Sequence, residues 1–263
     1  MRLASDALQH VRYRRGIFTA MLFALSVASG VSLAAQAPLN VAVYRGAAGC
    51  EGCSEMVVKA LRSVAMPLSI AYIGEHEKRK LNAQNLRQFD LYIQPGGGQD
   101  IPAAYDALGD EGARAVRDFV RSGKGYLGLC MGAYLADSNW LGLIASPLDS
   151  EVGRPGSHIA DEGDYTIAVT WDHRQETFYY QDGPYLVGQT QQDGFTPVAF
   201  YRNGDVAMAR YVYGKGTVVL TGPHPEADER WMGDVSDSGA TDTSPQQKMT
   251  RLLAYFSTQR AAK

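Results

Sequence analysis

The sequence has little cysteine and no excess of either charge. Only three of its 263 residues are cysteine, and 25 Lys and Arg face 28 Asp and Glu, which gives a formal net charge of −3. A chain this close to neutrality has no general attraction for phosphate backbones or anionic lipid, so we expect no nucleic-acid partner. Because 45% of the residues are hydrophobic, the composition excludes an intrinsically disordered chain.

Other absences limit the architecture. Beyond residue 38 there is no run of 18 apolar residues, so we expect no membrane span in the body of the protein. There is also no internal repeat, no low-complexity block and no linker long enough to separate two domains. Residues 38–263 are therefore predicted to form a single domain, with residues 234–244 as a polar surface loop.

The first 34 residues differ in composition from the rest. Arginines precede an apolar run from Ile17 to Ala35 that ends in small residues, which is typical of an export signal cleaved after Ala34. We predict a periplasmic or secreted protein, with the Sec route favoured over the twin-arginine route. The alternative is that the apolar run stays uncleaved as a membrane anchor, because its length just suffices to span a bilayer.

After residue 38, short apolar runs alternate with amphipathic stretches, and the second half is richer in strands. This pattern predicts an α/β fold with a doubly wound, mostly parallel sheet. A helix is expected to start with Ser54 as its cap. The predicted strands are 39–44, 68–73, 89–93, 126–130, 165–171, 185–189, 198–201, 206–213 and 217–221, and the predicted helices are 54–62, 110–121 and 246–258.

The sharpest chemical motif is Gly-Leu-Cys-Met-Gly at residues 128–132, where a predicted strand turns into a helix. Flanking glycines leave room for a nucleophile at such an elbow, above the carboxyl ends of the strands. A thiol at a helix N-terminus is also favoured as the reactive thiolate. Cys130 is therefore a candidate nucleophile, and the alternative is a buried cysteine that packs as a small hydrophobic residue.

A base for Cys130 is available in His224-Pro225-Glu226, which follows the predicted strand 217–221. In an extended chain residues two apart point the same way, so the Glu226 carboxylate can orient the His224 imidazole. Backbone N–H groups of Gly96, Gly97 and Met131 are candidate donors to an oxyanion. Together these residues predict cysteine-based nucleophilic catalysis.

These motifs resemble the class I glutamine amidotransferase-like superfamily, and within it the N-terminal domain of biotin-protein ligases. The matching segments are YRG at residues 44–46, QPGGG at 94–98, GYLGLCMGAY at 125–134, YYQDGP at 179–184 and GPHPE at 222–226. The resemblance implies a flavodoxin-like sandwich with a catalytic triad of Cys130, His224 and Glu226. No ligase catalytic domain follows in this sequence.

One departure from the superfamily affects the expected substrate. Glutaminase members carry Gln four residues after the nucleophile, whereas this chain has Tyr134. We therefore expect a hydrolase of an amide or γ-glutamyl-type bond in a small molecule or peptide, and no cofactor. The alternatives are a non-catalytic protein that binds such a molecule in the same cleft, and an envelope redox protein. Tyr134, Tyr180 and Asp182 are candidate pocket residues.

Cys50 and Cys53 form a CxxC motif at the start of the first predicted helix. In an oxidising compartment the two can close a small disulfide, which leaves Cys130 as the free thiol. A zinc site needs two further ligands, and no histidine of the chain stands at a recognised metal spacing, so we expect no metal.

Overall fold

The computed structural model describes residues 37–232 and 243–257. The predicted export signal, residues 1–34, lies outside the described residues, as does most of the predicted loop 234–244. Within those two ranges no helix combines the length and apolarity that a membrane crossing requires.

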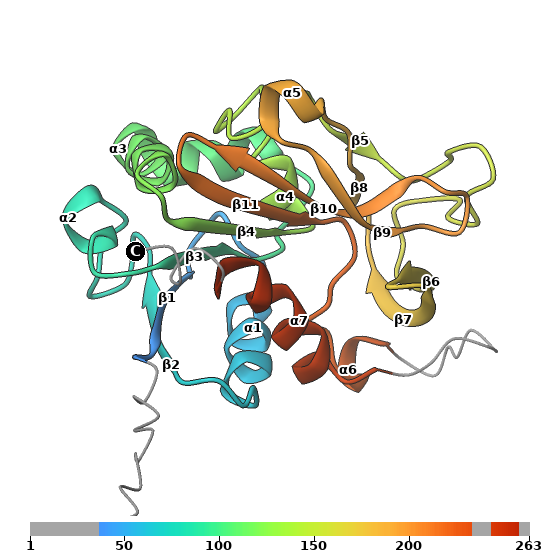
Figure 1. Cartoon of the computed structure of the whole chain (residues 1–263), viewed down its shortest axis with the longest axis horizontal. Coiled ribbons are helices and arrows are strands. Elements are labelled where there is room, and N and C mark those ends of the chain that lie inside the picture. The colour runs from blue at the N-terminus through green and yellow to red at the C-terminus, as the bar shows by residue number, and fades with distance from the viewer. Residues whose placement is uncertain (1–36, 233–242, 258–263) are drawn as a thin grey trace, which may run out of the picture. The chain divides into compact units, whose positions relative to one another are not determined.

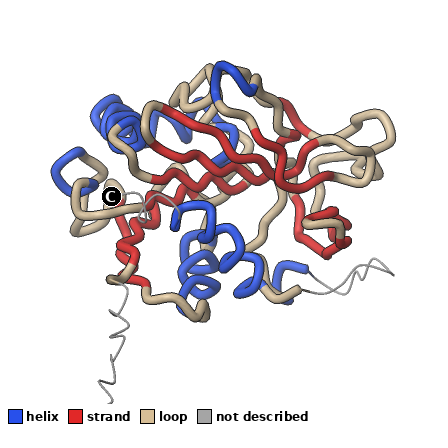
Figure 2. The backbone as a smooth tube through the Cα atoms, in the orientation of Figure 1, coloured by secondary structure: helices blue, strands red, loops and turns tan. Residues whose placement is uncertain are grey.

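One large sheet runs through the described part of the chain (Figures 1 and 2). Its strand order is β2-β1-β3-β4-β11-β10-β9-β6-β7, and the first five of these strands are parallel, whereas the remaining pairs are antiparallel. The parallel strands are β1 (Leu39–Tyr44), β2 (Leu68–Ile73), β3 (Leu91–Gln94), β4 (Gly125–Leu129) and β11 (Gly216–Thr221). The others are β6 (Tyr165–Trp171), β7 (Arg174–Tyr180), β9 (Thr196–Phe200) and β10 (Val206–Tyr213).

Helices cover both faces of the parallel strands. Successive residues of a strand point to opposite faces, and in β1 the side chains of Ala42 and Tyr44 join one core while Val41 and Val43 join the other. The first core includes α3 (Ile101–Arg121), and the second includes α1 (Cys53–Arg62) and α7 (Pro245–Ser257), which lie on the opposite side of the sheet in Figure 1. Burial on both faces explains the nearly continuous apolar runs in these strands.

Short elements complete the fold. They are α2 (Ala83–Leu86), α4 (Met131–Tyr134), α5 (Thr190–Asp193), α6 (Glu229–Met232), and the two-stranded pair β5 (Asp149–Ser150) and β8 (Pro184–Tyr185). Of these, α4 and β5 lie in the connection from the carboxyl end of β4 to the antiparallel half.

The predicted α/β class with a mostly parallel sheet is confirmed, but several predicted boundaries are wrong. Helix α1 has Gly52 at its N-cap, and the Ser54 hydroxyl donates to the Tyr44 carbonyl at 2.7 Å instead of capping the helix. Helix α3 consists of two helical segments that meet at a kink at the non-helical Gly109: the second coincides with the predicted helix 110–121, whereas the first, which begins at Ile101 and is capped by the Asp100 side chain, was not predicted. Only Tyr185 of the predicted strand 185–189 lies in a strand, and β7 was not predicted.

Candidate functional site

Cys130 lies at a sharp elbow between β4 and α4. Its φ of 51° and ψ of −112° are outside the ordinary regions for a residue with a side chain, and its own N–H still pairs with the Thr221 carbonyl of β11 at 2.8 Å. The side chain is 6% exposed, and the thiol donates to the Gln181 carbonyl at 3.3 Å. A backbone held this way presents the thiol at the carboxyl edge of the sheet.

The flanking glycines make this elbow possible. A Cβ atom on Gly128 would collide with the Gly132 carbonyl, and one on Gly132 would collide with the Gln94 carbonyl. Strand β4, the first turn of α4 and the end of β3 thus pack backbone against backbone, which any larger residue would prevent.

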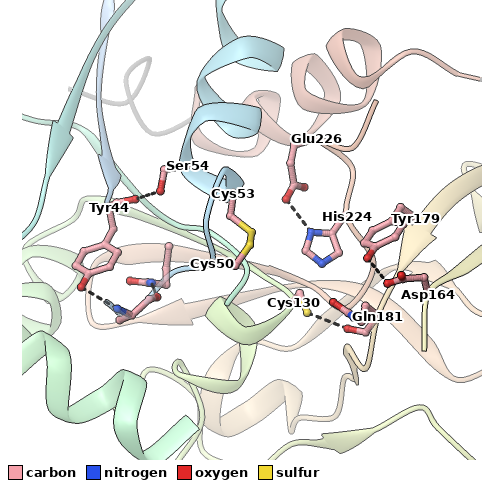
Figure 3. Close-up of a disulfide and its surroundings, with 12 residues drawn as sticks. Tyr44, Cys50, Cys53, Ser54, Cys130, Asp164, Tyr179, Gln181, His224 and Glu226 are labelled. Atoms are coloured by element: carbon pink, nitrogen blue, oxygen red, sulfur yellow. Dashed lines mark hydrogen bonds and ion pairs between the residues drawn. A yellow bond between two sulfur atoms is a disulfide. The ribbon is translucent and has the colours of Figure 1, made fainter. Parts of the chain in front are cut away.

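His224 and Glu226 follow β11, the strand beside β4. The Glu226 Oε1 atom lies 2.8 Å from His224 Nδ1, and both side chains are buried, at 4% and 0% exposure. In Figure 3 the imidazole ring lies between the Glu226 carboxylate and the Cys130 thiol. Adjacent parallel strands therefore bring thiol, imidazole and carboxylate together in the order that the sequence predicted.

The charges around His224 favour its protonated form. Burial alone lowers the pKa of this imidazole, but the neighbouring Glu226 carboxylate and the Cys130 side chain outweigh that effect and raise the pKa to about 10. An imidazolium held beside a thiol favours the thiolate, which is the nucleophilic form of cysteine.

Two aromatic rings hold the imidazole in place. Tyr179 of β7 and Trp231 of α6 each lie with their ring centroid 5.4 Å or less from that of His224, and the rings are tilted or perpendicular to it. The backbone N–H of His224 donates to the Tyr179 carbonyl at 2.9 Å, which ties this residue to β7. A single orientation of the ring is thereby fixed, with Nδ1 toward Glu226.

The glycine loop after β3 closes over the other side of the imidazole. A Cβ atom on Gly96 would lie 2.6 Å from His224 Cε1, and one on Gly97 would collide with the end of the Met131 side chain. The N–H of Met131 opens α4, and the first N–H groups of a helix have no partner within the helix. Gly96, Gly97 and Met131 therefore all lie around Cys130 and His224.

Cys50 and Cys53 form a disulfide, with their Cα atoms 5.3 Å apart. The Cys50 N–H donates to the Gly96 carbonyl at 3.0 Å, and the Gln94 amide donates to the Ala48 carbonyl at 2.6 Å. These two hydrogen bonds attach the loop that carries the disulfide to the glycine loop that packs against His224; Figure 3 shows the disulfide near Cys130 and His224.

A cavity of about 270 Å³ opens beside Cys130. Its wall comes from the glycine loop, the elbow, β5 and the two loops at residues 160–164 and 181–182. The lining residues are Gly97, Gly98, Gln99, Ile101, Cys130, Met131, Tyr134, Asp149, Ser150, Glu162, Gln181 and Asp182. A small ligand held there would lie against the thiol.

The structure places two of the three predicted pocket residues on this cavity. Tyr134 donates its hydroxyl to the Asp182 carbonyl at 3.2 Å, and the Asp182 carboxylate accepts from the Ser150 hydroxyl at 2.6 Å. Tyr180 lies behind the wall instead, fully buried, with its hydroxyl donating to the Gly183 carbonyl at 2.8 Å. An aromatic residue at this position fits a pocket as well as a core. The position of Tyr180 in β7 decides between them, because it points the side chain into the core.

Sequence reasoning missed several residues of the site. Gln99, Asp149, Ser150 and Glu162 line the cavity, and Trp231 contacts His224. None of them stands in a recognisable motif, so no pattern in the sequence could have selected them. In the described ranges no group of three or more His, Cys, Asp or Glu is arranged to hold a metal ion.

Comparison with known proteins supports this architecture. Residues 39–140 match the family model described as "Biotin-protein ligase, N terminal". A curated relative, the biotin–protein ligase of Schizosaccharomyces pombe, is 26% identical over 254 residues, which cover 83% of this chain and 37% of the relative. The chain thus spans little more than a third of the length of that relative.

A solved structure shows the same fold. The structure of PurLQS from Thermotoga maritima contains a chain that matches with a TM-score of 0.55 and 15% identity, over 83% of this chain and 99% of the other. That chain has a class I glutamine amidotransferase-like fold. The matched family segment contains the glycine loop and Cys130, whereas His224 and Glu226 lie beyond it and reach the site through the sheet.

Proposed function

We propose that this chain, which is related to the N-terminal part of biotin-protein ligases and has a class I glutamine amidotransferase-like fold, is a cysteine hydrolase of an amide or γ-glutamyl-type bond. The observation that carries the proposal is the buried contact of 2.8 Å between Glu226 and His224, next to a cysteine on a strained elbow. An export signal in residues 1–34 is part of the same proposal and makes the protein periplasmic or secreted.

The residues have separate roles in the proposed reaction. The Cys130 thiolate attacks the carbonyl carbon of the amide, and backbone N–H groups of Gly97 and Met131 stabilise the oxyanion that forms. The His224 imidazolium gives its proton to the departing amine, which leaves a thioester on Cys130. A water molecule, deprotonated by His224, then attacks the thioester, so that the carboxylic acid is released and the thiol restored. Glu226 holds the imidazole and stabilises its charge throughout.

The first test measures the reaction of Cys130 with iodoacetamide between pH 5 and 9. With the disulfide intact, Cys130 is the only free thiol, so one modification reports on it alone. We expect alkylation at pH 6 at least about tenfold faster than for free cysteine, because the imidazolium of His224 favours the thiolate. The variant His224→Ala should lose that advantage, whereas the matched variant His76→Ala, at an exposed histidine, should keep it.

Equal rates in the wild type and in His224→Ala would contradict the proposal. A second measurement follows ammonia or amine release from a panel of amides, where Cys130→Ala should reduce turnover to the uncatalysed level. If the rate of Cys130 alkylation does not depend on His224, but an added ligand still slows that alkylation, the protein is a binding protein instead. The Cys130 thiol donates to the Gln181 carbonyl at 3.3 Å, a contact that a binding site without catalysis could keep, and this observation favours the alternative.

A further inference from the structure

The wall of the cavity beside Cys130 carries charge of one sign. Asp149, Glu162 and Asp182 line it, and no Lys, Arg or His is among the lining residues. The groups that contact these carboxylates are uncharged: the Gln99 amide reaches Glu162 and Asp182, and Ser150 reaches Asp182 and Asp149. Among the described residues, no Lys, Arg or His forms an ion pair with these three carboxylates.

Three polar side chains of the cavity, those of Gln99, Ser150 and Tyr134, already donate to residues of this acidic wall. The Gln99 side chain donates to Glu162 at 2.8 Å and to Asp182 at 3.2 Å, and the Ser150 hydroxyl donates to Asp182 at 2.6 Å. The Tyr134 hydroxyl donates to the Asp182 backbone. The donors that remain are the side-chain amide of Gln181, which is uncharged, and the backbone N–H groups beside the thiol, which the proposed mechanism reserves for the oxyanion.

We infer that the substrate of this site carries a cationic group, an ammonium or guanidinium, a few bonds from the amide that is cleaved. This inference rests on the proposed function and narrows it. A cation entering the cavity meets three carboxylates that lack a charged partner, and it gains both Coulomb attraction and hydrogen-bond acceptors. A γ-glutamyl compound carries an α-ammonium that fits this wall, but its α-carboxylate would meet the same negative charges with no cationic partner, so substrates with the cation alone are favoured over it.

The charge of the cavity is measured with thiol reagents of equal size and opposite charge. Trimethylammonioethyl methanethiosulfonate and sulfonatoethyl methanethiosulfonate both react by attack of the thiolate on the sulfenyl sulfur, which forms a mixed disulfide and releases methanesulfinate. The ratio of the two rates for Cys130, divided by the same ratio for free cysteine, cancels intrinsic reactivity. We expect this normalised ratio to be at least about 10 at low ionic strength and to fall in 0.5 M salt.

Variants assign the effect to the wall. Asp149→Asn combined with Glu162→Gln should lower the ratio at least about threefold, and both side chains are exposed, so the fold should tolerate the change. The matched control is Asp110→Asn on α3, whose side chain is 89% exposed and is not among the lining residues. A normalised ratio near 1, or one that the double variant leaves unchanged, would overturn the inference.

Turnover separates this inference from the proposed function. Ammonia release is compared for Nα-acetyl-lysinamide, Nα-acetyl-norleucinamide and the α-amide of Nα-acetylglutamate, whose side chains are cationic, neutral and anionic. The expected order of kcat/KM is cationic, then neutral, then anionic. The opposite order refutes the cationic substrate but leaves a hydrolase. Alkylation of Cys130 that does not depend on His224 refutes the proposed hydrolase activity. In that case the ratio of the two methanethiosulfonate rates still shows whether the cavity is negatively charged.

Discussion

The parallel and antiparallel halves of the sheet contribute different parts of the site. Strands β3, β4 and β11 are buried along their whole length, and the residues that follow them are the glycine loop, Cys130 and His224. Strands β6 and β9 are only partly buried, and the loops around β6 and β7 supply Glu162, Gln181 and Asp182 to the cavity. The buried half positions the reactive groups, whereas the more exposed half determines the charge and shape around them.

The largest expected effect tests whether the two halves form one core. Phe178 of β7 is fully buried in the same cluster as Leu127 and Leu129 of β4. Phe178→Ala should lower the free energy of unfolding by about 4 kcal/mol, because it leaves a cavity between the halves. Urea denaturation followed by tryptophan fluorescence and by Cys130 accessibility should show one shared transition.

The matched control is Phe200→Ala on β9, whose side chain is 39% exposed. Its cost should stay below about 1 kcal/mol. Two separate transitions in the Phe178 variant would show that the antiparallel half unfolds independently.

The next effect concerns the buried pair of His224 and Glu226, which follows the parallel strand β11. The pKa of His224 is raised, so the stabilisation from its charged form is full below the unfolded value near 6.5 and is lost as the pH rises through about 10. Glu226→Gln removes the carboxylate that raises this pKa and should lower the free energy of unfolding by about 3 kcal/mol at pH 6. The difference from wild type should shrink toward pH 10, whereas Glu229→Gln, at an exposed position, should show no such pH dependence.

A smaller effect tests the close packing of the glycine loop. Gly96→Ala places a methyl group against the His224 ring and should cost about 2 kcal/mol, together with a fall in Cys130 alkylation at pH 6. Gly98→Ala is the matched change in the same loop, because nothing lies within 4 Å of its Cβ position. If Cys130 is alkylated at the wild-type rate in both variants, the glycine loop does not position His224.

The smallest effect concerns a buried acid of the antiparallel half. Burial, and then the charge of Asp205, raise the pKa of Glu151 to about 7. Its folded state therefore binds a proton more tightly than the unfolded chain, and its contribution to stability falls as the pH rises from about 4.5 through 7. The free energy of unfolding of Glu151→Gln minus that of wild type should be larger at pH 8 than at pH 5, by roughly 1–2 kcal/mol. Urea denaturation at the two pH values checks this, with Glu111→Gln on α3 as the exposed control.

Strands of both halves were predictable where their side chains follow local rules. Strands β1 and β2 of the parallel half and β6 and β10 of the antiparallel half were predicted with their observed bounds, since a short apolar run that ends at turn residues indicates a strand in either kind of pairing. The elbow at Cys130 was predictable for a similar reason, because close backbone packing admits only glycine at its flanks. Strand β7 escaped prediction because its first residues, Arg174 and Gln175, are exposed and polar.

By itself the sequence determined the α/β class and the identity of Cys130, His224 and Glu226 as candidates, because each follows a buried strand in a short motif with steric requirements of its own. Only the tertiary structure decided what surrounds them. Asp182 was already a candidate pocket residue, whereas Glu162 lies in a loop and Asp149 in the two-residue strand β5, where neither periodicity nor turn chemistry marks a functional residue. The antiparallel pairing of β6 with β7 and of β5 with β8 carries these segments over the thiol, and such long-range pairings leave no local trace in the sequence.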